Sequence, residues 1–159
     1  MSRYAFNAWT RTLLRGALAG VAATAAMSAV MFTARKAGLM GKVPPERITE
    51  AGLRVLRVRA SERSENALST VAHVGYGAVM GGLFATAGRT IRLPVPGPVA
   101  GALYGLAVWT VSYAGWIPLL GIMPPPHRDR HDRQTSMILA HLMYGAVLGT
   151  ITGGARTNV

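Results

Sequence analysis

The ten-residue stretch AHVGYGAVMG at residues 72–81 returns near the C-terminus as AHLMYGAVLG at residues 140–149, with seven identical positions. A second pair precedes it in each half of the chain, GKVPP at residues 41–45 and GIMPP at residues 121–125. Similar segments that recur in the same order along one chain indicate an internal duplication. The sequence therefore predicts two tandem copies of one structural unit.

Both copies lie in stretches free of formal charge. Only 14% of the 159 residues are charged and 50% are apolar, whereas a soluble domain carries about 25% charged residues. Asp, Glu, Lys and Arg are absent from residues 16–34, 66–88, 93–126 and 134–155. Each stretch is close to or longer than the ~20 helical residues that cross a bilayer. The pattern predicts membrane-spanning helices at about 13–34, 67–88, 99–117 and 135–154.

The duplication and the spans together predict a fold. With two spans in each unit, both units enter the membrane from the same side, which gives a parallel repeat. We expect an all-α, four-helix transmembrane bundle in one integral membrane domain over 1–159, with repeat 1 at about 13–90 and repeat 2 at about 97–155. Residues 118–126 hold four prolines and cannot continue a regular helix. They lie either at the membrane interface or in a re-entrant turn.

An insert at about 45–60 separates the two spans of repeat 1. Apolar side chains recur there at helical spacing, at Ile48, Ala51, Gly52, Val55 and Leu56, with charged residues on the other faces. This pattern predicts an amphipathic helix on the membrane surface or against a partner protein. A solvated helical linker fits the pattern equally well.

Small residues four apart line one face of each span. The glycines of this kind are Gly77, Gly81, Gly101, Gly105, Gly145, Gly149 and Gly153. Small side chains at this spacing let helix backbones approach closely in lipid. We therefore predict tight helix packing along these faces.

His73 and His141 are, tyrosine aside, the only ionisable residues inside the charge-free stretches, and the repeat places them at equal depth. An ionisable residue in the membrane is a functional candidate by default. Tyr76 and Tyr144 follow three residues after each histidine. Three interpretations stay open: interhelical hydrogen bonds with a structural role, a ligand or proton site in a transport path, and axial ligation of a b-type haem. No cofactor is predicted outright, and haem b is the one candidate.

The remaining composition narrows the function. The absence of Cys excludes disulfides and thiolate metal sites, and no predicted span carries a carboxylate for acid–base catalysis, so we expect no enzyme. His127, Asp129 and His131 are weak candidate ligands for Zn or Ni, because the loop's three arginines, Arg128, Arg130 and Arg133, oppose a bound cation. The net charge of +11 fits lipid head groups beside the spans better than nucleic acid.

The basic residues also predict an orientation. Six Lys and Arg flank the spans on the side of the termini, and eleven lie in the first and third loops. Because basic residues concentrate in cytoplasmic loops, both termini are expected outside the cell. The expected role is an accessory or structural protein that packs with itself or a larger membrane complex through its glycine faces. A small transporter or proton-handling protein is the alternative, and a b-haem electron carrier is the second alternative.

The stretch WIPLLGIMPP at residues 116–125, followed by AHLMYG at residues 140–145, resembles the YagU-like family of small bacterial inner-membrane proteins. The resemblance implies about four spans, a Pro-Pro pair after the third span and a histidine near the start of the last. It also implies that His73 is the counterpart of His141, and that the protein lies in the bacterial plasma membrane. It implies no particular activity.

Overall fold

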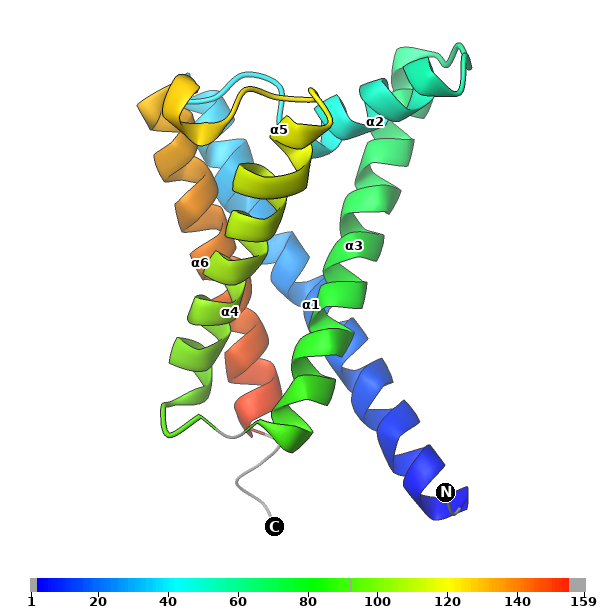
Figure 1. The fold of residues 1–159 in the computed structure, drawn as a ribbon, viewed down its shortest axis with the longest axis vertical. Helices are drawn as coiled ribbons and strands as arrows, with labels where there is room; N and C mark the ends of the chain where they lie inside the picture. Colours follow the sequence, from blue (N-terminus) through cyan, green and yellow to red (C-terminus); the bar gives the residue numbers. More distant parts are fainter. Residues whose placement is uncertain (1–2, 92, 155–159) are drawn as a thin grey trace.

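The structure is a computed structural model that describes residues 3–91 and 93–154, and these residues form helices joined by short loops, with no strand among them. The all-α prediction is therefore confirmed. In chain order the elements are α1 Arg3–Lys36, α2 Pro44–Val55, α3 Glu62–Thr90, α4 Gly97–Val111, the π-helical segment η1 Ser112–Trp116, α5 Ile117–Leu119, the 3₁₀ turn η2 Pro126–Arg128 and α6 His131–Gly154 (Figure 1). Arg92 and Arg156, which entered the orientation count, lie outside the described residues.

Three helices are long and apolar enough to cross a membrane: Asn7–Lys36, Glu62–Thr90 and His131–Gly153. The predicted third span, 99–117, is not one uniform α-helix. α4 ends after 15 residues, and η1 and α5 continue the helical path to Leu119.

Pro118 explains this change of helix type. Proline has no N–H, and its ring crowds the carbonyl four residues earlier, so the regular ladder cannot continue through it. The turn before it widens, and the Ile117 N–H donates to the Ser112 carbonyl five residues earlier. Single π-helical turns of this kind occur frequently at functional sites.

The amphipathic helix between the first two spans is present, but it is shorter than the sequence predicts. The amphipathic helix predicted at 45–60 is α2, which starts at Pro44 and ends five residues earlier than expected, at Val55. Proline fits the first helical position because its missing N–H would have no partner there. After α5, the chain turns at Gly121, whose φ of 67° glycine adopts without strain.

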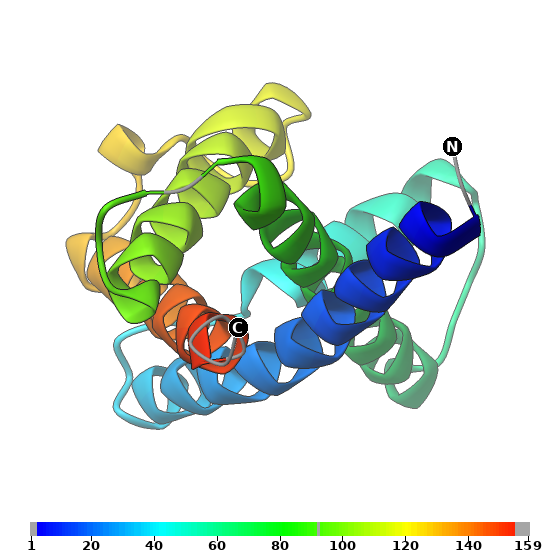
Figure 2. The ribbon, with the colours of Figure 1, turned by 90° about the horizontal axis from the view of Figure 1, so that it is seen from below.

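The long helices form two antiparallel pairs, α1 with α3 and α4 with α6. α1 also packs along α6 and joins the pairs, whereas α3 and α4 hardly touch (Figure 2). The core at this junction contains Met27 and Met31 of α1 with Met137, Tyr144 and Leu148 of α6. The bundle is therefore closed on the α1–α6 side and open between α3 and α4.

The glycines that were predicted to pack helices all lie at contacts within the chain. A methyl group on Gly81 would come within 2.7 Å of the Gly20 Cα. On the other pair, a methyl group on Gly101 would come within 2.8 Å of the Gly149 nitrogen. Gly105, Gly145, Gly149 and Gly153 meet the backbone of the facing helix in the same way, and Gly77 lies against the Thr24 side chain and the Gly20 carbonyl of α1. Only glycine permits these approaches between backbones.

Apolar side chains cover the outer face of the bundle. Large exposed ones occur on every long helix and include Leu18, Phe32, Val71, Leu83, Leu103, Val111, Leu139 and Ile151. Exposed apolar surface of this extent is typical of a protein face that contacts a membrane or another protein. Near the start of α1, the Arg89 guanidinium lies 4.9 Å from the centre of the Trp9 ring, a pair typical of a membrane–water interface.

Candidate functional site

A cavity of about 240 Å³ lies between α3 and α4, where the helices separate. α1 and α6 form its base, and α2 contributes side chains at one end. The four residues singled out from the sequence, His73, Tyr76, His141 and Tyr144, all line this cavity. The structure thus brings the two histidines and the two tyrosines, which the repeat relates in sequence, to the wall of one cavity.

His141 is fixed in the wall by its own helix. The side chain is 6% exposed, and its Nδ1 lies 2.8 Å from the Met137 carbonyl oxygen. Because a carbonyl can only accept, Nδ1 carries the proton in the neutral ring and donates it there. The lone pair is then on Nε2, which defines the tautomer that a ligand would meet.

His73 is held differently. Its Nε2 is buried and has no hydrogen-bond partner among the described residues. An unpaired polar atom in an apolar environment costs about 1–3 kcal/mol. This cost makes His73 Nε2 the wall atom with most to gain from a bound polar group.

Two tyrosines tie the walls of the cavity together. The Tyr144 hydroxyl donates to the Gly77 carbonyl at 2.7 Å, and the Tyr104 hydroxyl donates to the Met80 carbonyl at 2.8 Å. Both bonds run from the α4–α6 pair to α3. They hold α3 in place across the open side, where helix packing is sparse.

The π-helical segment supplies wall residues that the sequence reasoning missed. Ser112, Tyr113 and Trp116 all line the cavity, and Tyr113 is only 1% exposed. Pro118, directly after the predicted third span, was the available signal, because a proline disturbs the regular helix in the turn before it.

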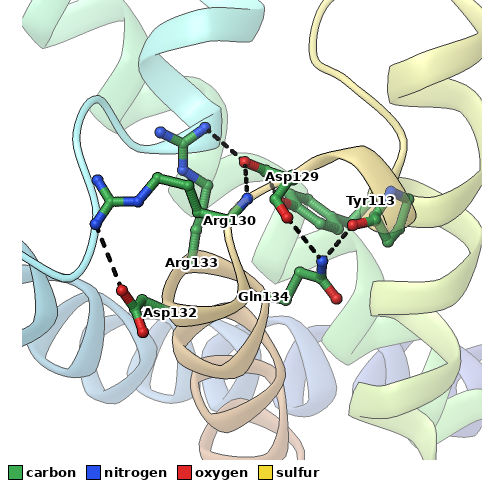
Figure 3. A network of polar contacts seen from close by, with 7 residues as sticks. Tyr113, Asp129, Arg130, Asp132, Arg133 and Gln134 are labelled. Atoms are coloured by element: carbon green, nitrogen blue, oxygen red, sulfur yellow. Dashed lines mark hydrogen bonds and ion pairs between the residues drawn. The ribbon is translucent and has the colours of Figure 1, made fainter.

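A polar network joins Tyr113, a residue of the cavity wall, to the loop before α6 (Figure 3). The Tyr113 hydroxyl donates to one oxygen of Asp129. The other oxygen accepts from the Arg130 backbone N–H at 2.8 Å and lies 3.4 Å from an Arg133 nitrogen. The Asp129 side chain is 4% exposed. A buried carboxylate with these partners anchors the loop onto η1 and α6.

The network occupies the carboxylate of the candidate metal-ligand set that the sequence offered, His127, Asp129 and His131. Asp129 points into the network, while both histidines are exposed. In the described part of the chain, no group of three or more His, Asp or Glu side chains could hold a metal ion.

The cavity walls are mainly apolar. Met27, Met31, Met80 and Met137 line it, and thioether side chains adapt their shape to irregular ligands. No carboxylate is present among the described lining residues. Apolar walls with a few placed polar groups are typical of small-molecule sites. This arrangement can bind a mainly apolar molecule that carries a hydrogen-bonding group.

The chain belongs to a family of unknown function, DUF6789, whose sequence pattern matches residues 10–158. The match covers α1 from residue 10 onward, the other three helices of the two pairs and every cavity residue named above. No curated protein and no solved structure matches the chain.

Proposed function

We propose that this chain is a non-enzymatic integral membrane protein that binds a small, lipid-soluble molecule between His73 and His141. The single observation that carries the proposal is the position of both imidazoles in the wall of one apolar cavity. Burial of imidazole groups in a membrane is costly unless they serve a function or find a partner.

We further propose four spans. α4, η1 and α5 run from Gly97 to Leu119, which at 1.5 Å per residue is about 34 Å long. That length is sufficient for the ~30 Å hydrocarbon core. Exposed apolar side chains on this path, such as Leu103 and Val111, support contact with lipid.

The spacing of the helix contacts supports a parallel repeat. Gly16 and Gly20 of α1 meet α3, and Gly97 and Gly101 of α4 meet α6 at the same four-residue step. α1 and α4 run in one direction, and α3 and α6 run in the other (Figure 1). The YagU-like stretch at 116–145 supports a bacterial plasma membrane, and the count of basic residues supports cytoplasmic first and third loops.

The structure changes the relative weight of the sequence interpretations. The accessory-protein interpretation used the glycine faces as surfaces for partners. These faces pack inside the chain, so an oligomer or larger complex would need other surfaces. The residues of the other interpretation, the two histidines and the tyrosines that follow them, all line one cavity. We therefore prefer ligand binding, alone or as a step in transport.

The test is chemical identification of what the purified protein holds. Protein extracted in mild detergent is separated from lipid and its bound small molecules are measured by mass spectrometry. We expect one defined molecule near a stoichiometric amount, and at least about tenfold less on the His73→Phe/His141→Phe variant, because each lost hydrogen bond costs about 1 kcal/mol. The loop variant His127→Phe/His131→Phe is the matched control and should keep the molecule.

The same samples test the haem alternative. A Soret band in the wild type that is absent from His73→Phe/His141→Phe would identify the bound molecule as haem b. If the double variant keeps its helical fold and still holds every molecule that the wild type holds, the proposal is overturned.

A further inference from the structure

A second cavity, of about 460 Å³, lies at the α2 end of the chain, between α1, α2 and α3. Its wall carries many more polar and charged side chains than the wall of the first cavity. Glu46, Glu50, Glu62 and Glu65 all line it, and these are all the glutamates of the chain. In a protein with a net charge of +11, this concentration sets the cavity apart from the rest of the surface.

The charges of this cavity are only partly neutralised. Arg35 lies 2.7 Å from Glu46, and Lys42 pairs with Glu50. The hydrogen bond and the charge of Glu50 raise the pKa of Lys42, so the lysine stays protonated. Glu62 and Glu65 have no ion pair among the described residues, and charged groups of this kind keep water around them.

A row of polar side chains leads from these glutamates along α3. Glu62, Asn66, Ser69 and His73 follow one another at three- or four-residue steps, and Thr70 lies beside them. Each step is about one helical turn, or ~5.4 Å, so the row occupies one face of the helix. It starts at Glu62, the first residue of α3, and reaches His73 about three helical turns further along.

His73 is where the two cavities meet. It lines both of them, as do Met31 and Pro45. The groups that face it through the two cavities come from every neighbouring element. They are Arg35 of α1, Lys42 of the loop, Glu46 and Glu50 of α2, Glu62, Glu65 and Tyr76 of α3, Tyr113 of η1, and His141 and Tyr144 of α6.

We propose that the polar cavity is a water-filled vestibule that connects His73 to the aqueous phase at the α2 end. His73 then exchanges protons with that phase while its ring contacts the apolar cavity. The inference extends the proposed function, because it takes His73 to lie at membrane depth. It assigns a proton-exchange role to His73 that His141, which lines only the apolar cavity, does not share.

The absence of Cys allows a direct test with single cysteines in the full chain, reconstituted into vesicles. Ser69→Cys and His73→Cys lie along the polar row. Leu68→Cys and Val71→Cys lie on the same helix but on its exposed apolar face. A charged thiol reagent that does not cross membranes reports water contact, because only a hydrated thiolate reacts quickly.

We expect Ser69→Cys and His73→Cys to react at least about tenfold faster than Val71→Cys. His73 is further along α3 than Val71, so a simple gradient with depth predicts the opposite order. Equally slow reaction at all four positions overturns the vestibule and leaves the ligand proposal standing. Equally fast reaction at all four overturns both, because the segment would then lie in water. If His73→Cys does not fold, the comparison uses the reaction rates of Ser69→Cys and Thr70→Cys on the polar row and of Leu68→Cys and Val71→Cys on the apolar face.

Discussion

The Tyr144 hydroxyl of α6 donates a 2.7 Å hydrogen bond to the Gly77 carbonyl of α3, 67 residues earlier in the chain. The bond joins the two helix pairs on the side where α3 and α4 hardly touch. A methyl group on Gly77 would collide with the Thr24 side chain of α1, so Gly77 also lies at the contact between α1 and α3. One glycine thus serves the α1–α3 contact and the cavity wall together.

The first prediction concerns this bond. Tyr144→Phe keeps the ring and removes the donor, so we expect a loss of ~0.6–2 kcal/mol in unfolding free energy, the range for hydrogen bonds between membrane helices. Unfolding in mixed micelles, followed by circular dichroism, measures the loss. A variant as stable as the wild type would show that the bond contributes nothing to the closure of the cavity.

The second prediction concerns glycine packing. A methyl group on Gly145 would come within 2.9 Å of the Ala102 Cα, so Gly145→Ala should cost ~1–3 kcal/mol by overpacking. Gly75 has nothing within 4 Å of the added methyl, and Gly75→Ala should be neutral or up to ~1 kcal/mol more stable, because alanine favours helix. The same unfolding assay compares them, and equal effects would contradict the observed α4–α6 contact.

The third prediction concerns the network over η1. Asp129→Ala leaves the Arg133 charge buried without its partner, and we expect a cost of about 3–5 kcal/mol. The exposed pair Arg130–Asp132, 3.4 Å apart, provides the control, because Asp132→Ala should cost less than ~1 kcal/mol. Thermal unfolding in detergent distinguishes them. A small effect of Asp129→Ala would mean that the network does not anchor the loop.

Part of this fold follows directly from the sequence. Long charge-free stretches specify the helices, and glycines at four-residue steps specify where two helices approach, because both properties depend on local composition. The pairing of His73 with His141 could also be predicted, since the repeat relates them. The amphipathic pattern located α2 but not its end at Val55.

Other features depend on contacts between distant segments, which no local pattern encodes. A symmetric repeat predicts equivalent α1–α6 and α3–α4 contacts, yet only the first is extensive. That asymmetry creates the cavity. Likewise, the sequence shows Asp129 as one acid in a charged loop, and only the fold brings it to Tyr113.

The most direct test of the central claim is photocrosslinking inside the cavity. A photoreactive diazirine residue replaces Val108, which lines the cavity and is 8% exposed, or Val111, which is 65% exposed on the same helix. After irradiation in native membranes, mass spectrometry identifies the adducts. We expect one defined small molecule at position 108, lost with His73→Phe/His141→Phe, and a mixture of phospholipids at position 111. The same phospholipid mixture at both positions would contradict a ligand site between the two histidines.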